Sequence, residues 1–270
     1  MAKNDCDCLE QRLRHRFAEF VSYRNTAVLS VLNTLKTMRM RGWTAFVFGG
    51  IPRGVFDDGK KYQPRDLDLV FDDEHFSCFE SAFERCVQRR NSYGGLRLRI
   101  HNMAVDAWPL RATWAFREGC IAEPSFEKLP STTFLNIDGV VVETVPPPGR
   151  KRRIYEAGFF AGWSQRTLDI NLRDNPHPAI CIARTLHISR RYGFKISHRL
   201  SMYVWQMLTA RPLAEIEAAQ ASHYGQVEFG REQLADLRHR LEAHLSSCSL
   251  FPVALFAARP DQIEFRLRLD

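Results

Sequence analysis

The chain has 270 residues, 45% of them hydrophobic, which is enough for the core of one large domain or of two smaller ones. Its formal net charge of +7 is compatible with a nucleic acid or polyphosphate partner, and equally with a mildly basic protein that binds neither. No apolar run approaches the roughly 18 residues of a membrane helix, and the polar amino terminus lacks the apolar core of a secretory signal, so no membrane partner is expected. The seven cysteines include no Cys-x-x-Cys pair, which favours reduced thiols in a cytoplasmic protein over disulfides or structural zinc.

The first half of the chain mixes helical and strand patterns. Apolar residues at helical spacing predict a helix or a helix pair over 9–41. The apolar run 43–48 predicts a buried strand that enters a tight turn at Gly49-Gly50. The other predictions for this half are a loop over 57–64, a second strand over 66–71, a helical segment over 74–90, strands over 96–100 and 103–108 joined by a hairpin around Ile100-His101-Asn102, and a strand at 140–142.

The second half is predicted to be helical. It follows the Pro-rich and basic stretch 146–153, which is either a linker or a basic contact loop. Helices are predicted at 176–194, 198–210, 212–221 and 230–246, with a short strand at 263–269. The sequence therefore predicts an α+β fold, divided into amino-terminal helices over 1–42, a mixed sheet-and-helix domain over 43–148, and a smaller all-helical domain over 149–270.

The predicted strand 66–71 carries two carboxylates in the sequence Asp-Leu-Asp-Leu-Val-Phe. Side chains i and i+2 of a strand share one face, so Asp66 and Asp68 point the same way while the leucines turn into the core. Two neighbouring carboxylates on a buried strand repel each other unless a cation neutralises them, and Mg²⁺ prefers such hard oxygen ligands together with substrate phosphates. Asp106, flanked by apolar residues on a later strand, is the best candidate for a third metal ligand.

Neither acidic feature specifies a metal site by itself. An Asp-x-Asp pair is more often a solvated strand end, and Asp106 alone is more often an exposed polar residue of an amphipathic strand. The upstream sequence changes this balance, because Gly49-Gly50 and Arg53 precede the acidic pair, with 16 positions from Gly50 to Asp66. Glycines let backbone N–H groups approach phosphate oxygens, and an arginine adds a bidentate contact. A phosphate-binding turn beside a metal-binding pair is what nucleoside triphosphate chemistry needs.

Three stretches carry a family resemblance: Phe-Gly-Gly-Ile-Pro-Arg-Gly at 48–54, Arg-Asp-Leu-Asp-Leu-Val-Phe at 65–71, and Val-Asp-Ala-Trp-Pro-Leu-Arg at 105–111. Together they resemble the nucleotidyltransferase superfamily of DNA polymerase β. They resemble more closely the class II tRNA nucleotidyltransferases (CCA-adding enzymes) and the bacterial poly(A) polymerases. The resemblance implies a polymerase β-like head, a mixed sheet with helices, followed by a smaller helical domain that is similar to the neck and body of that family.

The resemblance extends over roughly residues 43–200. Residues 133–139 are similar to the family segment Arg-Asp-Phe-Thr-Ile-Asn-Ala, although Ser-Thr-Thr at 131–133 stands where the family has Arg-Asp. Residues 175–196 are similar to the helix that follows the family's head domain. The family's base-selecting helix is not evident after residue 200, so the base that is added and the acceptor stay open.

The resemblance implies transfer of NMP from an NTP to an acceptor hydroxyl, with release of pyrophosphate. An RNA 3′ end, such as that of tRNA, is the first acceptor to consider, and ATP or CTP the first nucleotide. Two Mg²⁺ ions, for which Mn²⁺ is a substitute, would be held by Asp66, Asp68 and Asp106. The residues implied in nucleotide or phosphate binding are Gly49, Gly50, Arg53, Arg65 (a phosphate contact or a structural residue), Asn136, and Arg184 (orienting the nucleotide or forming a salt bridge in a helical interface).

RNA contacts are expected through the basic run 150–153 and the arginine-rich residues 184–199, although such runs also form ordinary solvated faces. Two alternatives stay open. One is a nucleotidyltransferase-type toxin or defence enzyme that modifies tRNA or a protein. The other is a non-catalytic RNA- or protein-binding module that retained the fold, against which the three intact carboxylates argue, because a decayed site is expected to lose at least one of them.

Overall fold

The computed structural model describes residues 3–22, 26–39 and 42–257, and the chain divides into two compact units. The first unit comprises Met1–Thr133 and Asp138–Phe160, and the second comprises Phe134–Ile137 and Ala161–Asp270. The boundary predicted from the sequence lies at 148–149, whereas the first unit continues to Phe160. The reason is that the strand after the Pro-rich stretch pairs with the sheet of the first unit.

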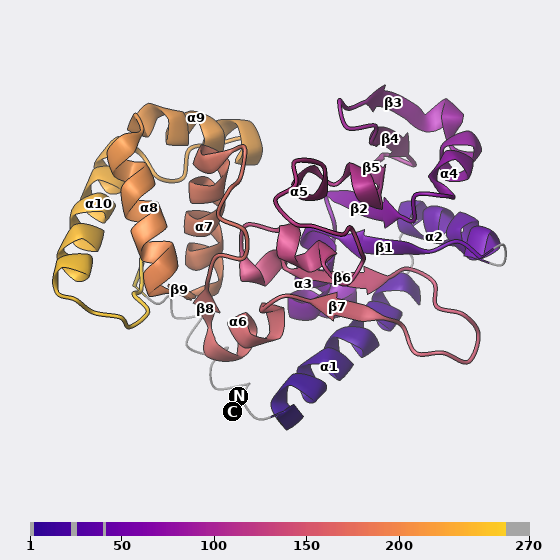
Figure 1. The fold of residues 1–270 in the computed structure, drawn as a ribbon, viewed down its shortest axis with the longest axis horizontal. Helices are drawn as coiled ribbons and strands as arrows, with labels where there is room; N and C mark the ends of the chain where they lie inside the picture. Colours follow the sequence, from indigo (N-terminus) through magenta and orange to yellow (C-terminus); the bar gives the residue numbers. More distant parts are fainter. Residues whose placement is uncertain (1–2, 23–25, 40–41, 258–270) are drawn as a thin grey trace. The chain divides into compact units, whose positions relative to one another are not determined.

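A seven-stranded mixed sheet forms the centre of the first unit, in the order β3-β4-β5-β2-β1-β6-β7 (Figure 1). β2 and β5 run parallel, and all other neighbouring strands run antiparallel. The strands are β1 (Ala45–Phe48), β2 (Asp66–Phe71), β3 (Val87–Arg90), β4 (Leu96–Ile100), β5 (Met103–Pro109), β6 (Val140–Glu143) and β7 (Ile154–Glu156). The two strands that carry the predicted metal ligands, β2 and β5, are therefore direct neighbours.

One face of this sheet is covered by helices. Leu67, Leu69 and Phe71 of β2 point to this face and are buried, as the alternating pattern predicts. Phe71 packs on Phe79, with ring centroids 4.4 Å apart. The helices of this unit are α1 (Lys3–Ser22), α2 (Thr26–Arg39), α3 (Gly50–Asp58), α4 (Phe76–Ala82) and α5 (Trp114–Arg117). Each large apolar side chain buried in this way contributes about 1.5–3 kcal/mol to folding.

Two segments of the first unit differ from the sequence prediction. The pattern predicts a helix throughout 74–90, whereas α4 ends at Ala82 and residues 87–90 form β3. The sequence of β3 has a weak strand signal, and its pairing with β4 decides its conformation. The stretch 57–64 is predicted to be a loop, whereas α3 continues through Asp58 into a 3₁₀ turn, Gly59–Lys61.

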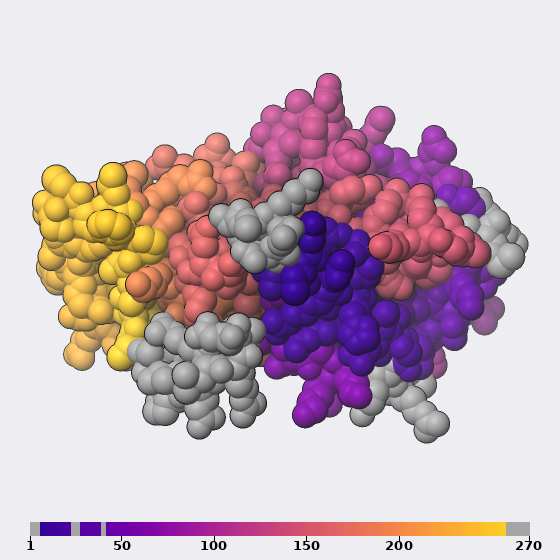
Figure 2. All heavy atoms as spheres, turned by 90° about the horizontal axis from the view of Figure 1, so that it is seen from below, coloured from indigo at the N-terminus to yellow at the C-terminus, as the bar shows by residue number. Residues whose placement is uncertain are grey.

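The amino-terminal region forms a helix pair, as predicted, and α1 packs on α3. Leu13 and Phe17 of α1 are fully buried. Arg16 Nη1 donates to the carbonyl oxygens of Phe56 and Asp57, each at 2.5 Å. These carbonyls belong to the last turn of α3, where backbone acceptors have no partner within the helix and a cation is favoured. Figure 2 shows α1 in indigo, beside the loop that follows β6.

That loop contains the basic run 150–153, and it folds around Glu143 at the end of β6. The Glu143 side chain is 1% exposed, and Arg153 Nη2 donates to its Oε1 at 2.8 Å. Burial alone disfavours the ionised form, but hydrogen bonds from Arg153 and the charges of Arg153 and Arg150 hold the pKa of Glu143 below its usual range. Arg152 lies over the Phe17 ring, 5.0 Å from its centroid, and burial lowers the pKa of Arg152 to about 10. Much of the basic run is thus bound to the first unit itself.

The described part of the second unit consists mainly of helices, of which the first is not predicted from the sequence and the other four are. They are α6 (Phe159–Gln165), which begins at the end of the first unit, α7 (Pro178–Tyr192), α8 (His198–Ala210), α9 (Leu213–Tyr224) and α10 (Arg231–Ser246), accompanied by a two-stranded sheet of β8 (Thr167–Leu168) and β9 (Lys195–Ile196). α7 ends at Gly193, whose φ of 65° gives the left-handed cap that glycine favours. Ser197 caps α8, its Oγ accepting from the backbone N of Leu200 at 3.1 Å. The strand predicted at 263–269 lies outside the described residues, and within the described ranges no helix is long and apolar enough to cross a bilayer.

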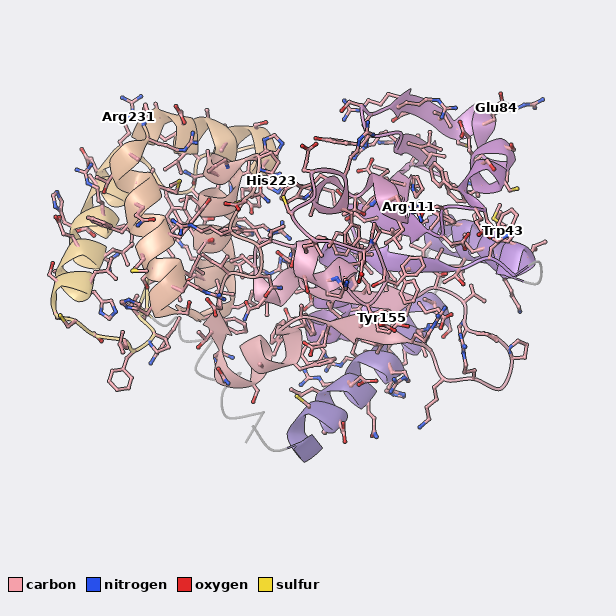
Figure 3. The ribbon with its side chains drawn as sticks, viewed as in Figure 1. Trp43, Glu84, Arg111, Tyr155, His223 and Arg231 are labelled. Carbon is pink, nitrogen blue, oxygen red and sulfur yellow. The ribbon has the colours of Figure 1, made fainter. Side chains whose placement is uncertain are left out.

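The second face of the large sheet changes from polar to apolar along the strands. Asp66 and Asp68 lie on this face, and the next residue that points the same way, Val70, joins an apolar cluster with Phe46, Leu110 and Phe116. Tyr155 of β7, labelled in Figure 3, packs against this cluster, its ring 5.5 Å from that of Phe46. One end of this face is therefore covered by the segment after β5, and the other end carries carboxylates.

The ion pairs of Glu143 with Arg150 and Arg153 are expected to hold the loop after β6 in place, and a substitution of Glu143 tests this. We expect Glu143→Gln to lower the free energy of unfolding at pH 7 by about 2 kcal/mol, less than the ~3–5 kcal/mol of a fully buried pair because both arginines keep solvent contact. The folded-state pKa of Glu143 is depressed, so its contribution is present above the unfolded-state pKa of about 4.3 and is lost as the pH falls through the folded-state value.

Urea unfolding of the wild type and of Glu143→Gln between pH 7 and pH 3 measures this pH dependence of stability. The difference in unfolding free energy between wild type and Glu143→Gln should shrink on acidification. Lys151→Gln, an exposed change in the same loop, should leave stability unaltered. A difference that stays constant over this pH range would contradict the assigned role of the ionised carboxylate.

Candidate active site

Three aspartates lie on one face at the centre of the large sheet. Asp68 of β2 is the direct ladder partner of Asp106 of β5, and Asp66 lies two residues earlier, opposite Ala104. Paired residues of neighbouring strands project to the same side, so all three carboxylates share a face. They are half-buried, whereas the residues between them on each strand are buried on the other face. The order β5-β2-β1 places this trio directly beside the strand that leads into the glycine turn.

Gly49 lies in contact with Asp68. Phe48, the last residue of β1, is the ladder partner of Asp68, so the chain leaves β1 next to that carboxylate. A Cβ at Gly49 would lie 2.2 Å from Asp68 Oδ2, and the backbone of Gly49 has a φ of 70°. Both the contact and the left-handed backbone exclude other residues. α3 begins at Gly50, directly after the glycine that contacts Asp68. The backbone N–H groups of its first turn have no partners within the helix.

Arg53 lies in the first turn of α3 and forms an ion pair with Asp138. Both side chains are largely buried, with exposed fractions of 15% and 7%. Arg53 Nη2 lies 3.9 Å from the position that a Cβ at Gly50 would take, and Arg53 Nε has no hydrogen-bond partner among the described residues. The guanidinium is therefore fixed beside the glycine turn by a buried acid.

Arg97 of β4 lies beside the aspartates and is not among the site residues predicted from the sequence. It is the ladder partner of Asp106, and its Nη1 donates to Asp106 Oδ2. The feature of the sequence that could have identified Arg97 is the hairpin turn between β4 and β5. His101 and Asn102 in this turn both have positive φ, 44° and 66°, as a two-residue type I′ turn requires. This turn pairs Ile100 with Met103, and counting three residues back along β4 and three forward along β5 places Arg97 opposite Asp106.

The charges around Asp106 act in opposite directions. Burial raises its pKa, the charge and hydrogen bond of Arg97 lower it, and the nearby charge of Asp66 raises it further. Asp66 in turn accepts from Arg65, whose Nη2 lies 3.1 Å from Oδ2 and whose side chain is 69% exposed. Asp106 and Asp66 thus bind arginines.

A divalent cation needs several oxygen donors that converge on one point. Within the described ranges, no group of three or more His, Cys, Asp and Glu side chains is arranged so that it could hold a metal ion. The three carboxylates nevertheless supply hard oxygen donors on one face, and Asp66 and Asp106 are close enough for one charge to shift the pKa of the other. Asp106 and Asp66 would have to exchange an arginine for the cation, which requires side-chain rotation and no change of strand register. The donor chemistry is therefore of the kind that a divalent metal prefers, and the side chains as they stand are paired with arginines instead.

The remaining sequence candidates lie in the second unit. Asn136 is buried, its Nδ2 donates to the carbonyl oxygen of Thr167 at 3.1 Å, and its Oδ1 accepts from the backbone N of Asp169 at 3.0 Å. Arg184 is half-buried on α7. Of the other arginines in 184–199, Arg190 pairs with Glu228 at 3.3 Å and Arg199 with Asp169 at 3.0 Å. The two hydrogen bonds of Asn136 give it a structural role, because they join residues 134–137 to the segment that contains β8.

No family model and no curated protein matches the sequence of this chain. Its structure is similar to the Thermotoga maritima CCA-adding enzyme complexed with tRNA, with a TM-score of 0.60 and 13% identity over 83% of this chain and 53% of that one. It is similar to a CCA-adding enzyme in complex with ATP, with a TM-score of 0.59 and 12% identity over 83% and 53%. A tRNA nucleotidyltransferase complexed with a primer tRNA and an ATP analogue gives 0.50 and 16%, over 81% and 71%.

The chain therefore spans about half the length of the first of these proteins. At such low identity the likeness is one of fold. Seven strands in a mixed sheet with the acidic strands at its centre, followed by a helical unit, agree with the fold class predicted from the motifs. The chain has the fold of the polymerase β-like nucleotidyltransferases.

Proposed function

We propose that this chain is a divalent-metal-dependent nucleotidyltransferase, which transfers NMP from an NTP to an acceptor hydroxyl and releases pyrophosphate. The observation that carries the proposal is the ladder pair of Asp68 and Asp106, with Asp66 on the same face and Gly49 in contact with Asp68. A carboxylate trio and a phosphate-accessible backbone turn in direct contact are what phosphoryl transfer from a triphosphate requires.

The carboxylates would hold the metal ions. Asp66 and Asp68 would hold the ion that contacts the triphosphate, and Asp106 would contribute to the second. Mg²⁺ suits these oxygen donors, and Mn²⁺ is expected to substitute. Bound there, the ions would neutralise the phosphate charge and lower the pKa of the acceptor hydroxyl.

The glycine turn would bind the β- and γ-phosphates. The free N–H groups at the start of α3 favour anions, and the absence of a side chain at Gly49 leaves the backbone open beside Asp68. Arg53 would add a charged contact, because the ion pair with Asp138 uses only part of its five donors. Arg65, Asn136 and Arg184 stay predictions as nucleotide contacts.

The solved neighbours support the substrate class. They include a CCA-adding enzyme with ATP, one with CTP, and enzymes with tRNA. ATP or CTP as donor, and an RNA 3′ end as acceptor, are therefore the first substrates to test.

Activity is tested by incubating the protein with each α-labelled NTP, Mg²⁺ or Mn²⁺, and total RNA. We expect label in RNA with ATP or CTP, and release of pyrophosphate. Asp68→Asn should reduce the rate at least about a hundredfold, because charge stabilisation by a bound metal is worth several kcal/mol, while thermal unfolding stays cooperative.

Glu74→Gln removes an exposed acid beyond the end of β2 and is the matched control, for which an unchanged rate is expected. Label in a protein instead of RNA would show that the acceptor is a protein, and the proposed reaction class would stay the same. Absence of label from RNA, protein and small molecules with every NTP and both metals would show that the chain is not a nucleotidyltransferase.

The contact between Gly49 and Asp68 gives a second test. Gly49→Ala should lower the transfer rate about a hundredfold and stability by more than about 2 kcal/mol, because the methyl group adds a collision with Asp68 to the strain of positive φ. Gly119→Ala has nearly the same φ, 71°, with no atom within 4 Å of the new methyl group. It should cost only the backbone strain, about 1–2 kcal/mol, and leave the rate unchanged. Equal transfer rates for the two variants would show that the glycine turn is not part of the active site.

A further inference from the structure

The face that carries the aspartates continues into a row of arginines. The β4–β5 register places Arg97 opposite Asp106 and Arg99 opposite Ala104, and the β3–β4 register places Arg89 opposite Arg97. Since ladder partners project to the same side, these three arginines, the arginine row, lie on the face of the carboxylates. In Figure 1, β4 and β3 follow β5 at the end of the sheet.

The arginine row is presented to solvent. Arg89 and Arg99 are exposed, and the Arg97 side chain is 34% exposed. The alternate residues Leu96, Leu98 and Ile100 are buried and anchor β4 from the other face. The row also reaches the site directly, since Arg97 donates to Asp106.

Two other arginines of this part of the first unit are paired with acids. Arg90, one residue after Arg89 and on the opposite face, pairs with Glu80 of α4. Arg111, which follows β5 and is labelled in Figure 3, pairs with Asp73 at 3.4 Å. The basic run 150–153, which is the most obvious RNA candidate in the sequence, is largely bound to Glu143 and Phe17. In the arginine row, Arg97 pairs with Asp106 of the acidic trio, while Arg89 and Arg99 are exposed on the strand pair β3–β4.

The glycine turn and the arginine row lie on opposite sides of the carboxylates. Gly49 lies on the β1 side of Asp68, and Arg97 lies on the β4 side of Asp106, so the carboxylates stand between them. In-line transfer places the attacking and leaving oxygens on opposite sides of the reacting phosphate. If the triphosphate binds at the glycine turn, the acceptor has to approach from the opposite side, which is the arginine row.

We propose that Arg89, Arg97 and Arg99 bind the sugar–phosphate backbone of a single-stranded RNA end and bring its terminal hydroxyl to the carboxylates. The inference rests on the proposed function, because it takes the three aspartates as the catalytic centre. Three guanidinium groups on one strand pair suit consecutive phosphates, to which arginine donates bidentate hydrogen bonds. They read no base, so the row binds RNA ends of different sequence.

Binding is measured in the absence of NTP by the fluorescence anisotropy of a 5′-labelled single-stranded RNA between 50 and 200 mM KCl. We expect Arg89→Gln with Arg99→Gln to weaken binding roughly tenfold, and to reduce the slope of log K against log salt by about 1.4, since each phosphate contact of a single strand contributes about 0.7. The pair Arg150→Gln with Lys151→Gln removes the same charge from the loop after β6 and should change neither value. Arg89→Lys with Arg99→Lys should restore most of the salt dependence.

The kinetic counterpart separates this inference from the proposed function. The Arg89→Gln and Arg99→Gln double variant should raise the KM for RNA about tenfold and leave the KM for NTP unchanged. Wild-type RNA affinity in this variant, or an equal loss in the control pair, would overturn the arginine row while NTP-dependent labelling persists. Transfer to a protein, with an acidic peptide competing for the row, would also overturn it. Row-dependent RNA binding without any NTP-dependent labelling would instead refute the nucleotidyltransferase proposal.

Discussion

The parallel pairing of β2 with β5 is the constraint on which the candidate site depends. It places Asp68 opposite Asp106 and fixes which side chains share a face. Parallel neighbours need a crossover of a dozen or more residues, and here residues 72–102 supply it. That crossover contains α4, which covers one face, and then β3 and β4, which extend the sheet beyond β5. The segment that makes the parallel pairing possible is therefore the segment that brings Arg97 to Asp106.

The electrostatic arrangement follows from the same geometry. Three carboxylates on one sheet face repel each other, and this cost is offset by arginines from positions that the register dictates. Arg97 neutralises Asp106 from β4, and Arg65 neutralises Asp66 from the adjacent position in the chain. Further along the same face, Val70 and Phe46 enter an apolar cluster, which holds the strands in place beside the carboxylates. A rigid apolar end and a charged end on one face make a preorganised site, because the backbone does not have to move when side chains exchange partners.

Local patterns in the sequence predict much of this, and long-range pairings account for the rest. Period-two alternation in 66–71 gives the face of Asp66 and Asp68, and the helices of the second unit follow from 3.6-residue periodicity. The adjacency of β2 and β5 is a contact across the crossover, and no local pattern specifies it. β3 forms because β4 is there to pair with it, so a helix is predicted in its place. The partner of Arg97 was within reach of sequence reasoning, since a two-residue hairpin turn sets the register.

The basic run 150–153 shows why charge in a sequence and charge on a surface differ. Arg153 and Arg150 are bound to Glu143, a buried acid whose place opposite Phe46 is set by the β1–β6 register. The arginines of β3 and β4 are less conspicuous in the sequence, yet strand alternation projects them from a sheet whose other face is buried. A strand that buries its leucines has to present the intervening residues, so arginines at those positions are available to a ligand beside the carboxylates.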